Sequence, residues 1–227
     1  MRFALRLNGT TACKWDTIIP FEPLWGQYKR IIKDNGAIVL FGSQPFTSAL
    51  VMSNPKWFKY CWVWEKIRPT GFANAKKRPL KLTEDICVFG GSNYYPQGLV
   101  RIDKQMMNSK STGGDTTGTF KYGEPYVQEF TNYPKNVLKF ELDEKSKLHP
   151  TQKPVPLLEY LVKTYTNEGD LVLDNCAGSG TTAIACLNTN RQFIVMEKEQ
   201  KYYDIILKRV ADFNKNFEPQ TLFGNEM

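Results

Sequence analysis

The sequence predicts an α/β fold built on a doubly wound, mostly parallel sheet, and two observations lead to this prediction. In the C-terminal half, strand-length and helix-length segments alternate at the spacing of β-α-β units, at 169–174, 180–190, 191–197 and 199–213. Nearer the N-terminus, "AIVLFG" (37–42) is an uninterrupted apolar run, which is typical of a parallel strand buried on both faces. A chain of 227 residues is long enough for one such domain carrying an insertion.

Two further helices are predicted from the spacing of their apolar residues. The first covers 21–36 and ends at Asn35-Gly36, and the face that it turns inward carries Leu24, Tyr28, Ile31 and Ile32. The second covers 153–165 with Pro in its first turn, and its inward stripe is Val155, Leu158, Leu161, Val162 and Tyr165. The remaining elements are a loop leading into a helix at 43–53 and strands at 2–7, 58–66 and 85–90.

The composition changes between residues 91 and 148. This segment is rich in Gly, Thr and Tyr and shows little periodicity, so we expect an irregular excursion from the core. Loops of this length usually have a function or lack fixed structure. The predicted organisation therefore has four parts, at 1–90, 91–148, 149–213 and a tail at 214–227.

Charge and cysteine content narrow the class of protein. The net charge of +7 favours a polyanionic partner, although basic proteins without such a partner are common. The five cysteines include no C-x-x-C pair and there is a single histidine, which argues against a zinc site and for reduced thiols. The sequence shows neither a signal-peptide core nor a membrane span, so a cytoplasmic protein without membrane or metal partners is expected.

The segment "LVLDNCAGSGTTAIACL" (171–187) has the features of a ligand-binding turn. It matches neither the P-loop nor the full dinucleotide pattern. Asp174 ends one predicted strand, Glu197 ends the next, and Gly178 and Gly180 lie between them, where close approach to backbone amides is possible. A carboxylate after the second strand suits a ribose diol, which favours an adenosine-containing cofactor. The alternative is a tight strand-to-helix turn without a ligand.

The residues around this turn carry a resemblance to a known family. The block "LHPTQKPVPLLEYLV" (148–162), the turn "LDNCAGSGTT" and the following "FIVME" resemble the cofactor half of DNA amino-methyltransferases. These enzymes methylate adenine N6 or cytosine N4. The match is to the circularly permuted, beta-type group, in which the cofactor half follows the catalytic half, and 9–51 and 62–90 look like that catalytic half in short, often phage-borne, members.

The resemblance implies a Rossmann-like methyltransferase fold that binds S-adenosylmethionine and double-stranded DNA. It implies that 1–90 is an N-terminally shortened catalytic half, 91–148 a target-recognition insertion and 149–213 the cofactor half. It also implies a monomer or homodimer. The residues that it places at the cofactor are Thr151, Gln152 and Lys153 near the methionine end, Asp174, Gly178 and Gly180 at the turn, and Glu197 at the ribose.

One motif of the family has no counterpart in this sequence. Members carry Asp or Asn, two prolines and an aromatic immediately before the segment that corresponds to "GTTACKWD", and these groups orient the target amine and stack on the flipped base. The positions are filled here by Leu5, Arg6, Leu7 and Asn8, so no catalytic residue is intact and the N-terminus has the character of a truncated or rearranged one. Loss of a positioned proton acceptor costs roughly 10²–10⁴-fold in rate.

Basic residues near aromatic ones are the candidates for DNA contact. Lys76, Lys77 and Arg78 follow Phe72, and Lys14 and Trp15 lie on the loop after the catalytic motif's position. The alternative is an exposed basic loop that binds nothing.

Three functions compete at this stage. The first is a site-specific DNA methyltransferase, with adenine N6 favoured over cytosine N4, from which we expect little or no methyl transfer. The second is an inactive remnant that binds DNA, S-adenosylmethionine or both. The third is a dehydrogenase-like protein, against which the incomplete glycine pattern and the H-P-T-Q-K-P block argue.

Overall fold

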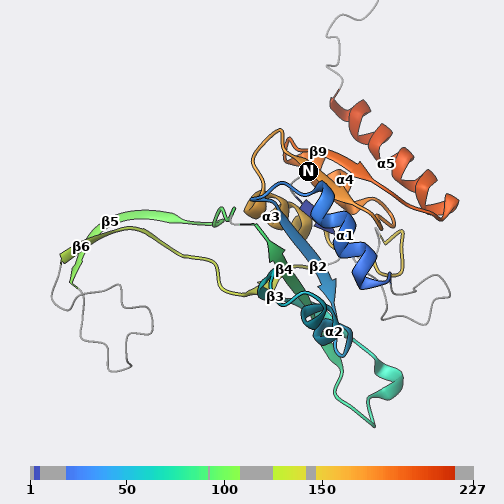
Figure 1. The fold of residues 1–227 in the computed structure, drawn as a ribbon, viewed down its shortest axis with the longest axis horizontal. Helices are drawn as coiled ribbons and strands as arrows, with labels where there is room; N and C mark the ends of the chain where they lie inside the picture. Colours follow the sequence, from blue (N-terminus) through green and yellow to red (C-terminus); the bar gives the residue numbers. More distant parts are fainter. Residues whose placement is uncertain (1–2, 6–18, 92, 108–124, 142–146, 218–227) are drawn as a thin grey trace, which may run out of the picture. The chain divides into compact units, whose positions relative to one another are not determined.

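The computed structural model describes residues 3–5, 19–91, 93–107, 125–141 and 147–217. The chain divides into two compact units (Figure 1), of which the larger comprises 1–95 and 136–227 and the smaller comprises 96–135. Within the described ranges, no helix combines the length and the apolar character that crossing a bilayer requires.

A seven-stranded sheet forms the centre of the larger unit. Its order is β7 (Val137–Lys139), β3 (Phe58–Thr70), β4 (Lys81–Gly90), β2 (Ala37–Gly42), β1 (Phe3–Leu5), β8 (Leu171–Asp174) and β9 (Gln192–Val195). Every neighbouring pair is parallel except the two that involve β4, which runs antiparallel to β2 and β3. The predicted mostly parallel sheet is confirmed, and the reversal of β4 follows from the hairpin that joins it directly to β3.

The strand β1 pairs with one strand from each half of the sequence. This short strand lies between β2 and β8, and its residue Leu5 pairs with Val39 on one side and Asp174 on the other. Strands that are far apart in the chain therefore end at one edge of the sheet. In doubly wound folds this carboxyl edge is where ligands bind.

Helices cover both faces of the sheet, as a doubly wound fold requires. They are α1 (Phe21–Ile31), α2 (Phe46–Ser53), α3 (Val155–Tyr165), α4 (Thr181–Asn188) and α5 (Gln200–Phe217). Residues alternate along β2 between the two cores. Val39 packs with Leu161 of α3 and Ala185 of α4, and Leu40 packs with residues of α1 and α2. All six residues of β2 are buried for this reason.

The segment 91–148 contains strands that were not predicted. In the smaller unit, β5 (Val100–Met107) and β6 (Pro125–Thr131) form a two-stranded antiparallel sheet. Almost all residues of β5 are exposed, so the segment has no apolar face to produce an alternating pattern. The strand β7 belongs to the larger unit, where it extends the main sheet beside β3. A short 3-10 helix, η1 (Phe72–Asn74), lies in the connection between β3 and β4.

Candidate functional site

A buried carboxylate anchors the turn after β8. Asp174 is only 3% exposed, and it accepts hydrogen bonds from the backbone N–H of Cys176 (3.0 Å) and from the hydroxyl of Thr182 (2.6 Å). The first donor belongs to the turn and the second to α4. The side chain of Asp174 therefore joins the end of the strand to the beginning of the helix, which holds the backbone of the turn in one conformation.

The two glycines of the turn adopt backbone conformations that other residues rarely take. Gly178 and Gly180 have φ values of +56° and +75°, and Gly180 is the N-cap of α4. A Cβ at Gly180 would stand 2.8 Å from Cγ1 of Ile206 in α5. From the same helix, the guanidinium of Arg209 donates to the carbonyl of Ser179 (2.6 Å). Packing against α5 thus explains the requirement for Gly180 without any ligand.

Glu197 lies beside this turn, just after β9. Its carboxylate accepts hydrogen bonds from the backbone N–H groups of Gly178 (2.8 Å) and Glu199 (3.0 Å). The backbone N–H of Met196 donates to the carbonyl of Asp174 (2.8 Å), so the ends of β8 and β9 are directly joined. Asp174 and Glu197 therefore occupy the same edge of the sheet. The hydroxyl groups of a ribose diol would have to share the Glu197 carboxylate with these two backbone N–H donors or displace them.

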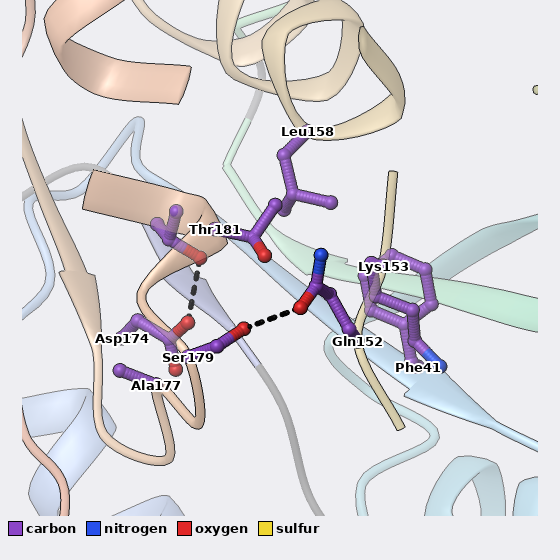
Figure 2. Close-up of a pocket in the computed structure, with 9 residues that line it drawn as sticks. Phe41, Gln152, Lys153, Leu158, Asp174, Ala177, Ser179 and Thr181 are labelled. Carbon is purple, nitrogen blue, oxygen red and sulfur yellow. Dashed lines mark hydrogen bonds between the residues drawn. The ribbon is translucent and has the colours of Figure 1, made fainter. Parts of the chain in front are cut away.

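A pocket opens at this edge, between the turn and the segment that precedes α3 (Figure 2). Of the residues expected at a cofactor, Gln152, Lys153 and Asp174 line it, whereas Thr151, Gly178, Gly180 and Glu197 lie outside its lining. The lining residues that were not expected at a cofactor are Phe41, Leu158, Ala177, Ser179, Thr181 and Thr182. Four of these belong to the quoted glycine turn and the start of its helix, so the motif itself was the signal that could have identified them.

Gln152 connects the segment before α3 to the glycine turn. The side chain is 7% exposed, and its Oε1 accepts hydrogen bonds from the hydroxyl of Ser179 (2.9 Å) and from the backbone N–H of Leu148 (2.9 Å). Nearby, the single histidine, His149, is buried with its ring centroid 4.2 Å from that of Tyr202 in α5. The imidazole packs against α5 and its Nδ1 accepts a hydrogen bond from the backbone N–H of Thr151 (3.2 Å), and we assign it no chemical role.

Lys153 takes part in a cluster of charged side chains behind the pocket. Its ammonium lies 2.5 Å from one carboxylate oxygen of Glu84, and the ammonium of Lys66 lies 3.2 Å from the other. The rings of Phe41 and Trp64 approach the Lys153 ammonium at 5.1 and 5.4 Å. Burial alone would raise the pKa of Glu84, but the two ammonium groups outweigh it and lower that pKa to about 2. No local sequence pattern marks Glu84 or Lys66 as part of a site.

Three of the five residues expected to contact DNA lie in the part of the chain that the structure describes. Lys76, Lys77 and Arg78 are exposed in the connection between β3 and β4, which also holds Phe72, 67% exposed. Arg78 lines a groove together with Lys81 of β4 and residues 43–46 at the start of α2. Lys14 and Trp15 lie outside the described residues.

The motif position is described only at its first residue. Leu5 ends β1 in register with Asp174, whereas Arg6, Leu7 and Asn8 lie outside the described residues. In the part of the chain that the structure describes, no group of three or more His, Cys, Asp or Glu side chains is arranged to hold a metal ion.

Known proteins resemble this chain in sequence and in fold. A relative, the type II methyltransferase M.BglII of Bacillus subtilis, is 34% identical over 166 residues, which cover 68% of this chain and 43% of the relative. The chain spans about half the length of the curated relatives it matches. Among solved structures, an M1.HpyAVI–SAM complex has a TM-score of 0.59 at 24% identity, covering 92% of this chain and 88% of that one.

A second solved structure supports the same fold. The cytosine-N4-specific PvuII DNA methyltransferase has a TM-score of 0.60 at 15% identity, covering 98% of this chain and 81% of that one. At these identities the two likenesses establish a Rossmann-like methyltransferase fold. The model of the N6_N4_Mtase family, described as DNA methylase, matches residues 13–208. Because that match covers most of the chain, the protein belongs to this family of DNA methylases.

Proposed function

We propose that the chain is the methyltransferase domain of a DNA amino-methyltransferase that uses S-adenosylmethionine. The observation that carries the proposal is the pocket at the carboxyl edge of the sheet, lined by Gln152, Lys153 and Asp174, in a chain of the DNA methylase family. The substrate would be the exocyclic amine of a base in double-stranded DNA, with adenine N6 favoured over cytosine N4. The relative M.BglII is named a type II methyltransferase, and this name supports the proposed substrate class.

The lining of the pocket suits such a cofactor. It combines a carboxylate, an amide and hydroxyl groups with the apolar side chains of Phe41, Leu158 and Ala177. S-Adenosylmethionine presents a similar combination, because its amino-acid end and ribose are polar and its adenine ring is largely apolar. When bound, it supplies a methyl group on an electrophilic sulfonium.

We assign the residues of the site to two ends of the cofactor. Thr151, Gln152 and Lys153 would face the methionine end, and Gln152 is already fixed by its bond from Ser179. The turn formed by Asp174, Gly178 and Gly180 would approach the nucleoside, with its backbone held by the bonds to the Asp174 carboxylate. Glu197 would accept the ribose hydroxyls, and this role requires it to add to or exchange its present backbone donors.

The transfer step also needs an acceptor for the protons of the target amine. The lone pair of an exocyclic amine is delocalised into the base, and a positioned oxygen helps to localise it toward the methyl group. The position that the family fills with Asp or Asn is held by Leu5, whose side chain carries neither a carboxylate nor an amide. We therefore expect slow transfer. An inactive domain that binds cofactor and DNA is the second candidate, and the substituted motif is the observation that favours it.

The DNA would contact the exposed basic connection between β3 and β4. Lys76, Lys77 and Arg78 would neutralise phosphates, with Lys14 and Trp15 approaching the same strand. The insertion 91–148 would read the target sequence. The oligomeric state proposed is a monomer or a homodimer.

A two-stage assay tests this function. Calorimetry of the full chain with S-adenosylmethionine measures cofactor binding, and transfer of labelled methyl to unmethylated duplex DNA, followed by mass spectrometry of the nucleosides, distinguishes N6-methyladenine from N4-methylcytosine. We expect cofactor binding with little transfer. Robust transfer would refute the expectation drawn from the motif, and absence of cofactor binding would refute the proposed function.

A further inference from the structure

The charged cluster behind the pocket contains a carboxylate that does not itself line the pocket. Glu84 lies on the reversed strand β4, and its two oxygens contact the ammonium groups of Lys153 and Lys66. Of these three residues, only Lys153 is part of the lining. The three side chains are between 12% and 19% exposed, so water screens their charges only partly.

The surroundings keep these charges in place at neutral pH. The ring faces of Phe41 and Trp64 lie next to the Lys153 ammonium, which restricts the positions that it can adopt. The low pKa of Glu84 means that its carboxylate is ionised whenever the protein is near neutral pH. The positive charge that Lys153 brings to the pocket wall is therefore accompanied by a negative charge at hydrogen-bonding distance.

This arrangement bears on a difference between cofactor and product. S-Adenosylmethionine carries a positive sulfonium, whereas S-adenosylhomocysteine, left after methyl transfer, has a neutral thioether and is otherwise the same molecule. An uncompensated ammonium in the pocket wall would repel the first and not the second. We propose that Glu84 is a positioning residue that holds and counterbalances Lys153, and that it thereby allows the pocket to favour the sulfonium cofactor over the thioether product.

The inference rests on the proposed function, and it predicts the effect of one charge. Glu84→Gln raises the net charge behind the pocket by one while keeping the size of the side chain. By Coulomb's law, at an effective dielectric constant of about 20, one unit charge changes the affinity for another roughly tenfold at a separation of about 12 Å and roughly threefold at about 25 Å. The ratio of the dissociation constants, cofactor over product, should therefore rise about threefold to tenfold in Glu84→Gln.

The experiment measures both dissociation constants by calorimetry on the full chain. The variants are Glu84→Gln, the double variant Glu84→Gln/Lys153→Gln, and Glu65→Gln as a matched control. Glu65 follows Trp64, the residue of β3 that pairs with Glu84. Glu65 forms an ion pair with Lys139 (3.1 Å), and neither residue lines the pocket. The double variant should bring the ratio back toward that of the parent protein, and the control should leave it unchanged.

A fourth variant keeps the test decisive if Glu84→Gln does not fold. Lys66→Gln removes one positive charge from the same cluster, so the ratio should shift in the opposite direction, toward the cofactor. An unchanged ratio in Lys66→Gln, or equal weakening of both ligands in Glu84→Gln, would assign Glu84 a purely structural role and overturn the inference. If the parent protein binds neither ligand, the proposed function fails instead, and the two failures are thus distinguishable.

Discussion

Replacement of Gly180 by Ala tests whether the glycine turn is required by the fold itself. The residue has a φ of +75°, and an added Cβ would stand 2.8 Å from Cγ1 and 3.2 Å from Cγ2 of Ile206. The left-handed conformation costs an alanine about 1–2 kcal/mol. Overpacking against a buried side chain adds about 1–3 kcal/mol, because Ile206 is 4% exposed and cannot move into solvent. We therefore expect Gly180→Ala to lower the free energy of unfolding by about 2–5 kcal/mol.

Two other glycines separate the two contributions. Gly71 has a φ of +95° with no atom within 4 Å of an added Cβ, so Gly71→Ala should show the conformational cost alone, about 1–2 kcal/mol. Gly26 lies inside α1 with equally open space, and Gly26→Ala should stabilise the protein by about 0.5–1 kcal/mol. Urea denaturation without ligand measures all three free energies of unfolding.

The comparison between Gly180→Ala and Gly71→Ala decides the question. If their losses agree within about 0.5 kcal/mol, the contact with Ile206 contributes nothing and the packing argument is refuted. A second check uses Ile206→Ala, which removes the two nearest of the three Ile206 atoms that an added Cβ would meet and leaves only the Cβ, at 3.3 Å. In that background, Gly180→Ala should lose only the conformational cost.

Two further predictions concern charge. The pKa of Glu84 in the folded protein, about 2, lies below its ordinary value of 4.5, so its stabilisation is complete above about pH 4.5 and is lost as the pH falls toward about 2. The difference in unfolding free energy between the parent protein and Glu84→Gln should therefore shrink between about pH 4.5 and about pH 2, and a constant difference in urea titrations would contradict the assignment. The double variant Lys76→Ala/Lys77→Ala should weaken binding to all DNA duplexes similarly. It should also reduce the slope of log affinity against log salt concentration by roughly 2. The control is the double variant Lys29→Ala/Arg30→Ala on α1. An unaltered slope would remove the β3–β4 connection from the DNA surface.

The elements of the C-terminal half could be predicted because local patterns determine them. The helix α3 has apolar residues at helical spacing, and Leu158, Leu161, Val162 and Tyr165 of the predicted stripe are buried. The turn after β8 combines an acidic residue with glycines at positions that require positive φ. Such signals lie within a few residues of one another, so the sequence contains them directly.

What escaped prediction depends on contacts between distant residues or on strands without an apolar face. The ion pair between Lys153 and Glu84 joins residues 69 apart in the sequence, and neither residue has a neighbour that signals the other. The strands β5 and β6 are mostly exposed, so the alternation of apolar and polar residues that reveals a half-buried strand is missing. Tertiary pairing alone determines both features.

The place of β1 explains how a permuted chain can assemble one site. A strand of three residues pairs with β2 of the first half and with β8 of the second, so Leu5 ends level with Asp174. The carboxyl end of β1 therefore lies at the edge of the sheet where the pocket opens. In the proposed transfer reaction, an acceptor for the target amine would have to reach this edge, whichever part of a polypeptide supplies it. The order of the two halves along the chain is thus secondary to the order of the strands in the sheet.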